Sequence, residues 1–169
     1  MFDLTKIKKL GDIPKVQAEL RPDYTAQIFQ DRESTYKELD QRSNQIANRL
    51  IECGLEKQAR VGFIGKNSDR YFELLFGACK ANIVLVGVNW RLAPPEMQYI
   101  LKDAACEILF VGKEYEELVE DIRKECPTIR EVVGMDSSDF GGSFIDNWFE
   151  NSSADEPIVE INGHDDVLQ

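Results

Sequence analysis

The chain has 169 residues, of which 43% are hydrophobic and 30% charged, a composition typical of a soluble globular domain. Its 20 Lys and Arg residues and 31 Asp and Glu residues leave a net charge of −11. Residues 114–169 carry 16 of the acids and three of the bases. Nucleic-acid binding needs clustered positive charge. The balance therefore argues against a nucleic-acid partner, and we interpret the acidic third as a solvated face.

Cysteine and histidine spacing limits the chemistry further. The four cysteines form no CxxC pair, and the single histidine, His164, is far from them in sequence, which excludes zinc sites of the usual spacing. Gly163 and the aspartates that follow His164 predict an exposed turn. No apolar run approaches the ~18 residues needed to span a bilayer. We expect a cytoplasmic protein with reduced, buried thiols.

Residues 1–34 predict a helix and a hairpin. Asp12 and Pro14 favour the start of a short helix that ends before Pro22. A strand is expected over Thr25–Gln30, with a turn at 31–33.

A longer helix follows. Thr35 and Glu38 fit a capping box. Apolar residues then recur at helical spacing to about Cys53, where Gly54 can take the left-handed conformation that ends a helix.

The rest of the sequence alternates between short β-branched runs and amphipathic segments, which predicts an α/β fold with a parallel βαβ sheet covered by helices on both faces. Its crossovers should be right-handed. A short helix over 143–149 follows, and 157–161 fits an edge strand. The remaining strands are expected over 60–64, 82–88, 107–111 and 131–135, and the helices over 69–80, 95–102 and 114–125.

The segment Gly62–Ser68 looks like a phosphate loop, because it follows a strand and opens a helix. It lacks the glycine spacing of a Walker loop and does not complete GxGxxG. We therefore interpret Asn67 or Ser68 as the cap of the next helix. Two other groups also have structural interpretations. Met97, Trp90 and Trp148 are expected in the core, and the acids between Glu114 and Asp121 on a solvent-facing helix.

Two blocks of sequence resemble the adenylate-forming acyl-CoA synthetases. STYKELDQRSNQIANRL, at 34–50, is similar to the first block of that family, and residues 61–111, from VGFIGKNSD to EILFV, resemble the next. The resemblance runs from about Gly11 to the end and is greatest to the fatty-acyl-CoA ligases. Asn82 stands where the family has glycine, which a residue tolerant of left-handed backbone accommodates. Gly87 stands where the family often has proline.

The resemblance implies a protein that makes an acyl adenylate from a carboxylic acid and Mg-ATP and passes the acyl group to coenzyme A. ATP, Mg²⁺ and coenzyme A are thus the implied cofactors, and a fatty or other carboxylic acid the implied substrate. The chain would be the N-terminal subdomain of the large AMP-binding domain, ending before the phosphate loop. Its parts would be a helix and hairpin over 1–34, a βαβ core over 35–136 and an acidic segment over 137–169.

Without that loop and the family's catalytic lysine, the fragment alone is expected to be inactive, since nothing would neutralise the charge that develops in phosphoryl transfer. The resemblance assigns no catalytic or metal-binding residue to this chain. An apolar face left uncovered at residue 169 predicts a homo-oligomer.

Arg91 is the one candidate site residue. It matches the arginine of the family's N-x-R motif, which lies near the nucleotide end of coenzyme A in some members, and a guanidinium suits a phosphate. The alternative is a surface arginine that anchors its loop to a neighbouring carbonyl or carboxylate. For the whole chain the alternatives are a non-catalytic α/β binding module and a synthetase for aryl or amino acids.

Overall fold

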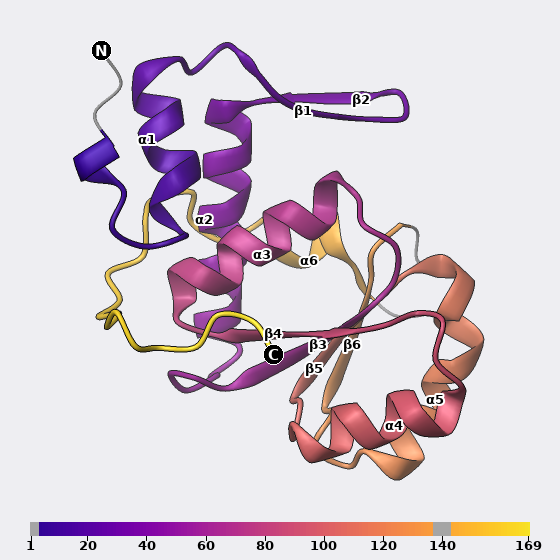
Figure 1. Ribbon diagram of the computed structural model, residues 1–169. Coiled ribbons are helices and arrows are strands. Elements are labelled where there is room, and N and C mark those ends of the chain that lie inside the picture. The colour runs from indigo at the N-terminus through magenta and orange to yellow at the C-terminus, as the bar shows by residue number, and fades with distance from the viewer. Residues whose placement is uncertain (1–3, 137–142) are drawn as a thin grey trace.

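Five parallel strands form the central sheet in the computed structural model, which describes residues 4–136 and 143–169 (Figure 1). Every neighbouring pair runs parallel, as predicted. The first residues of the expected acidic segment, 137–142, lie outside the described part. In spatial order the strands are β4 (Val84–Val88), β3 (Arg60–Ile64), β5 (Ile108–Val111), β6 (Glu131–Gly134) and β7 (Ser143–Phe144).

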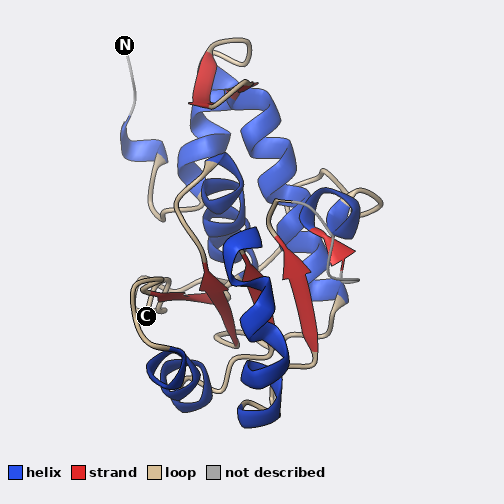
Figure 2. Cartoon of the chain, turned by 90° about the vertical axis from the view of Figure 1, so that its right-hand side faces the viewer, coloured by secondary structure: helices blue, strands red, loops and turns tan. Residues whose placement is uncertain are grey.

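Helices cover both faces of this sheet, which confirms the predicted α/β architecture (Figures 1 and 2). Strand residues of alternating parity point to opposite faces, so Phe110 joins one buried cluster and Leu109 the other. Because both faces are covered, the four longer strands are almost continuously apolar. One face carries α2 (Tyr36–Glu52), α3 (Asp69–Ala81) and α6 (Ile145–Phe149), and the other α4 (Pro94–Asp103) and α5 (Val119–Glu125).

The capping box predicted for the long helix is present. The Thr35 hydroxyl accepts a hydrogen bond from the Glu38 N–H at 3.2 Å, and the Thr35 N–H donates to Glu38 Oε2 at 2.8 Å. Thr35 and Glu38 thereby satisfy two donors that would otherwise lack partners at the start of α2.

A smaller layer lies beyond the sheet, where an antiparallel hairpin projects above α2 and α3 (Figure 1). The helix and hairpin expected in the first 34 residues are both present, but the predicted turn at 31–33 is wrong: the turn lies at 30–31, because Arg32 already pairs with Phe29. They comprise the 3₁₀ turn η1 (Leu4–Lys6), α1 (Asp12–Leu20), β1 (Thr25–Phe29) and β2 (Arg32–Thr35).

Both ends of α3 follow the expected chemistry. The Ser68 hydroxyl accepts the Tyr71 N–H at 3.3 Å, so the segment that resembles a phosphate loop supplies a helix cap. At the other end Asn82 takes the left-handed conformation with φ 58°.

The structure corrects three predicted elements. Residues 157–161 do not form an edge strand: Ile158 is fully exposed, and the position beside β4 is occupied by 167–169 through a parallel bridge from Leu168 to Leu85. The helix expected over 114–125 begins as a 3₁₀ turn, η2 (Lys113–Leu118), without a side-chain cap, and becomes α5 only at Val119. The helix expected over 143–149 starts at Ile145, since 143–144 pair with β6.

Three of the four thiols and the histidine lie as predicted. Cys79, Cys106 and Cys126 are buried and Cys53 is half-buried, and all four are free. Burial raises the pKa of Cys79 to about 11 and that of Cys106 to about 12. His164 is exposed in a turn. Among the described residues, no helix has both the length and the apolar character that a membrane span requires.

Candidate functional site

The strand order creates a crevice at one edge of the sheet. After β3 the chain crosses to β4 on one side and then returns to β5 on the other, so the loops after β3 and β5 diverge. Ligands of open α/β sheets bind at the carboxyl ends of the strands at such a switch point. A pocket of about 440 Å³ lies here, lined by residues of both loops, including Lys66, Ser68, Gly112 and Glu114.

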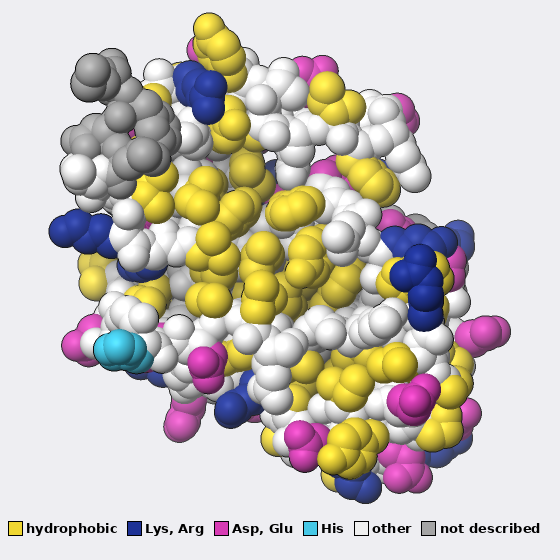
Figure 3. Space-filling model, viewed as in Figure 1, with side chains coloured by type: hydrophobic (Ala, Val, Ile, Leu, Met, Phe, Trp, Pro, Cys, Tyr) yellow, Lys and Arg dark blue, Asp and Glu magenta, His cyan; other side chains and the backbone are white. Residues whose placement is uncertain are grey.

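Trp90 and two cations form a cluster at this edge. The Arg91 guanidinium lies 4.0 Å from the centre of the Trp90 ring, and Lys66 Nζ lies 5.5 Å from the same centre. Arg91 follows the end of β4, and Lys66 follows the end of the neighbouring β3. Figure 3 shows Lys and Arg side chains gathered on the side toward which β4 runs in Figure 1.

A hydrogen bond from its backbone holds Arg91 in position. Its N–H donates to the Asn89 side-chain oxygen at 3.0 Å, which closes a small turn directly after β4. The Arg91 side chain is exposed. Among the described residues the Arg91 guanidinium contacts the Trp90 ring and forms no ion pair with a carboxylate. The alternative interpretation, a surface arginine that anchors its loop, therefore has no carboxylate partner in this part of the chain.

Lys66 has an acidic neighbour that Arg91 lacks. Lys66 Nζ lies 2.9 Å from Glu114 Oε1, and its hydrogen bond lowers the pKa of Glu114. Both side chains are exposed, so water and salt screen this pair. The cluster thus keeps excess positive charge at Arg91, beside an aromatic ring that can also stack on a base. It is suited to a phosphate carried by a nucleotide.

From the sequence, Arg91 is a candidate, which stays a prediction, and the residues around it were not identified. Trp90 was expected in the core; instead it is half-buried and packs its ring against the two cations. Trp148 and Met97 are buried as expected. The sequence contained one sign of this cluster: Lys66 and Arg91 each follow a parallel strand by two or three residues. Within the described chain no group of three His, Cys, Asp or Glu side chains could hold a metal ion, so we assign no residue to Mg²⁺.

The fold and this cluster together describe an α/β domain with exposed positive charge and an aromatic ring at the carboxyl edge of its sheet. Residues 15–168 match the AMP-binding enzyme family. The chain belongs to that family.

Individual relatives agree. The chain is 34% identical over 141 residues to the fatty acid–[acyl-carrier-protein] ligase ScoC of Streptomyces coeruleorubidus, covering 83% of this chain and 27% of that protein. It is 29% identical over 158 residues to the long-chain-fatty-acid–CoA ligase FadD13 of Mycobacterium tuberculosis, covering 92% of this chain and 29% of that protein. The chain therefore spans less than a third of these relatives.

Solved structures show the same arrangement. The anthranilate CoA ligase AuaEII, in complex with anthranoyl-AMP, superimposes with a TM-score of 0.88 at 27% identity, over 95% of this chain and 31% of that one. The N-terminal domain of FACL13 from Mycobacterium tuberculosis gives a TM-score of 0.85 at 28% identity, over 96% of this chain and 41% of that one. The fold is thus that of the N-terminal region of acyl-CoA ligases.

Proposed function

We propose that this chain is the N-terminal part of an AMP-forming acid–CoA ligase that acts on fatty acids in the cytoplasm. The reaction joins a carboxylate to the α-phosphate of ATP with loss of pyrophosphate. The thiol of coenzyme A then attacks the acyl carbon and releases AMP. The family match over 15–168 supports the reaction class, and the similarity to long-chain-fatty-acid–CoA ligase FadD13 supports the substrate.

The chain's own contribution is proposed to be the binding of coenzyme A through Arg91. Its exposed guanidinium, positioned by Asn89 and stacked on Trp90, is the observation that carries this role. The 3′-phosphate of coenzyme A is a dianion that such a group binds well. ATP and Mg²⁺ belong to the proposed reaction, but we assign them no residue here.

The acyl acceptor has a second candidate, because ScoC is by name a ligase for an acyl carrier protein. Carrier-protein phosphopantetheine has the same thiol arm but no 3′-phosphate. The proposed role of Arg91 in binding the 3′-phosphate therefore favours coenzyme A over a carrier protein as the acyl acceptor. The acid has a second candidate too, since AuaEII is an anthranilate CoA ligase.

The test compares the two half-reactions in a ligase that contains these residues. Arg91→Ala should raise the KM for coenzyme A about fivefold, the equivalent of about 1 kcal/mol for one exposed ionic contact, and leave ATP–pyrophosphate exchange unchanged. With dephospho-coenzyme A, which lacks the 3′-phosphate, the wild-type and Arg91→Ala enzymes should show no such difference. The 169-residue chain alone should catalyse no exchange.

Arg123→Ala, an arginine on α5 away from the cluster, is the matched control. Equal damage to both half-reactions would show that Arg91 is structural. An equal effect of Arg91→Ala on dephospho-coenzyme A would overturn the assignment to the 3′-phosphate. Exchange by the isolated chain, above a blank prepared from cells that lack it, would contradict its proposed inactivity.

A further inference from the structure

A second pocket, distinct from the strand-end cluster, lies between the hairpin and the helices beneath it. It has a volume of about 560 Å³ and is lined by β2, α2, the first turns of α3 and Asp146 of α6. Its walls are almost entirely polar or charged side chains. A pocket of this size accommodates a small ligand, and its polar walls do not suit an apolar one.

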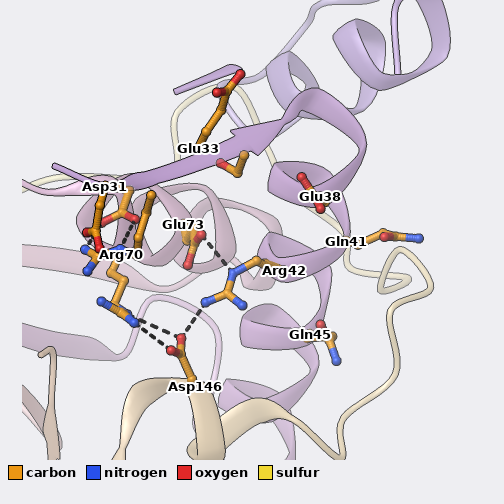
Figure 4. A pocket seen from close by; sticks show the side chains of 12 residues that line it. Asp31, Glu33, Glu38, Gln41, Arg42, Gln45, Arg70, Glu73 and Asp146 are labelled. Atoms are coloured by element: carbon orange, nitrogen blue, oxygen red, sulfur yellow. Dashed lines mark hydrogen bonds and ion pairs between the residues drawn. The ribbon is translucent and has the colours of Figure 1, made fainter. Parts of the chain in front are cut away.

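Ion pairs join the helices at the bottom of this pocket. Asp146 lies between two arginines, with Arg70 Nη2 at 2.7 Å from its Oδ2 and Arg42 bonded to its Oδ1 (Figure 4). Arg42 Nε also donates to Glu73 Oε1 at 2.8 Å. Beside them Arg32 forms a two-pronged pair with Asp69, at 2.7 and 2.6 Å. Each of the three guanidiniums therefore already has a carboxylate partner.

Glu73 is the carboxylate of this network that keeps an unpaired oxygen. Its side chain is only 4% exposed. While Oε1 is bound by Arg42, the buried Oε2 has no hydrogen-bond partner among the described residues. The Ser34 hydroxyl, which lines the same pocket from β2, is likewise buried without a partner. A buried carboxylate oxygen without a donor is costly, so the pocket offers an acceptor that a donor can satisfy.

The charge around the pocket favours a cation as that donor. Six carboxylates and three arginines line it. Three of the carboxylates, Asp31, Glu33 and Glu38, form no ion pair in the described part of the chain and lie toward the exposed rim. The pocket thus combines a buried acceptor with an acidic entrance, and its net lining charge is −3.

We propose that this pocket binds a small organic cation with N–H donors, of the diamine or polyamine class. One ammonium group donates to Glu73 Oε2 in the interior, and a second ammonium lies near the rim carboxylates of the hairpin and α2. Because the ligand contacts β2, α2 and α3 together, its binding would hold the hairpin against the two helices.

Calorimetric titration of the 169-residue chain with spermidine at low ionic strength tests the proposal. We expect saturable binding that weakens as salt is raised, because charges at the rim are screened. Tetramethylammonium, a cation without N–H donors, should bind at least tenfold more weakly than spermidine. An amino acid such as alanine, whose carboxylate would approach the acidic rim, should also bind more weakly.

Three substitutions locate the site. Glu73→Gln keeps the shape of the acceptor and removes its charge, and should weaken spermidine binding at least tenfold. Asp31→Asn changes only an exposed rim residue, so the fold is preserved, and should weaken binding two- to fivefold. Glu117→Gln, which removes the same charge from an exposed position on η2, is the matched control and should leave binding unchanged. Circular dichroism checks that each variant is folded.

Three results would overturn the proposal. They are no saturable binding of spermidine, equal binding of tetramethylammonium, and equal weakening by Asp31→Asn and Glu117→Gln, which would reveal only general charge attraction. None of these results bears on Arg91 or on ligase activity, so this site and the proposed function are tested separately.

Discussion

Asn82 takes a backbone conformation that usually requires glycine. Its φ of 58° is the left-handed conformation that usually selects glycine at a helix end. Its side chain accepts a hydrogen bond from Gln58 at 2.6 Å and donates to Asp165 and to the Glu160 carbonyl. Asn82 therefore ends α3 and also ties the C-terminal segment to the sheet, which a glycine could not do.

Gly77 determines how closely α2 and α3 approach. A Cβ added at Gly77 would lie 2.5 Å from Ile46 Cγ2, 2.8 Å from Ile46 Cβ and 3.1 Å from the Ser43 carbonyl oxygen. Real Cβ atoms essentially never lie within 3.0 Å of another heavy atom, so for the two Ile46 contacts either the helices must separate or Ile46 must leave its rotamer. Ile46 is completely buried, which leaves it little room to move.

Gly77→Ala is therefore expected to destabilise the protein by about 1–2 kcal/mol, since overpacking costs more than the gain in helix propensity of ~1 kcal/mol. Urea denaturation followed by circular dichroism measures the change. Gly87→Ala is the control, because nothing lies within 4 Å of a Cβ at Gly87, and it should change stability by less than about 0.5 kcal/mol. A Gly77→Ala protein as stable as the wild type would contradict this account of the helix contact.

Helix α2 holds a segment that has no regular structure of its own. Three amides on one face of the helix donate to backbone carbonyls between 150 and 155: Asn44 to Ala154 at 3.0 Å, Gln45 to Glu150 and Ser152, and Asn48 to Ser153 and Asp155. Asn44, Gln45 and Asn48 thereby satisfy polar groups that a loop leaves unpaired. The polar face of α2 is thus a binding surface for its own chain rather than only a solvent-facing one.

Asn48→Ala should loosen this segment. It removes hydrogen bonds of 2.7 and 2.9 Å, which predicts a loss of about 0.5–1.5 kcal/mol. Hydrogen–deuterium exchange should be faster over 150–156, with the sheet unaffected. Gln41→Ala, an exposed change on the same helix, should leave exchange there as in the wild type. Unaltered protection in Asn48→Ala would mean that the amides do not hold the segment.

The molecule as a whole presents an apolar area on one face. Figure 3 shows hydrophobic side chains gathered across its centre, over the region of α3 and β4 in Figure 1. Phe72 of α3 is 42% exposed and Leu168, beside β4, is 50% exposed. Contiguous apolar surface on a protein tends to be covered by a partner, which is consistent with the homo-oligomer predicted from the sequence.

Light scattering over a dilution series tests that prediction. The mass should rise above the 19.3 kDa of one chain as concentration increases. Phe72→Asp should shift association to higher concentration, because it replaces an exposed apolar side chain of α3 with a charge. Tyr99→Asp, on exposed α4, should have no such effect. A 19.3 kDa monomer at the highest concentration, with no binding of a hydrophobic dye, would refute association through this face.

Most elements of the fold could be predicted from interactions between residues that are close in sequence. The Thr35–Glu38 box, the Ser68 cap and the apolar strands were predictable because neighbours in sequence make those interactions, and burial on both faces demands apolar runs. The same information placed Arg91 after a strand. The prediction of an edge strand at 157–161 was wrong, because an alternating pattern does not determine which segment occupies the edge of a sheet. In the structure residues 167–169 lie beside β4.

Contacts between distant residues were decided only by tertiary structure. The stacking of Lys66 and Arg91 on one ring required β3 and β4 to be neighbours in register. The pocket around Glu73 joins residues from 31 to 146, and its unpaired oxygen depends on how four elements pack. Spacing in a sequence reports helix faces and strand parity, whereas charge pairing and pocket shape arise from the distances between elements, which no local pattern contains.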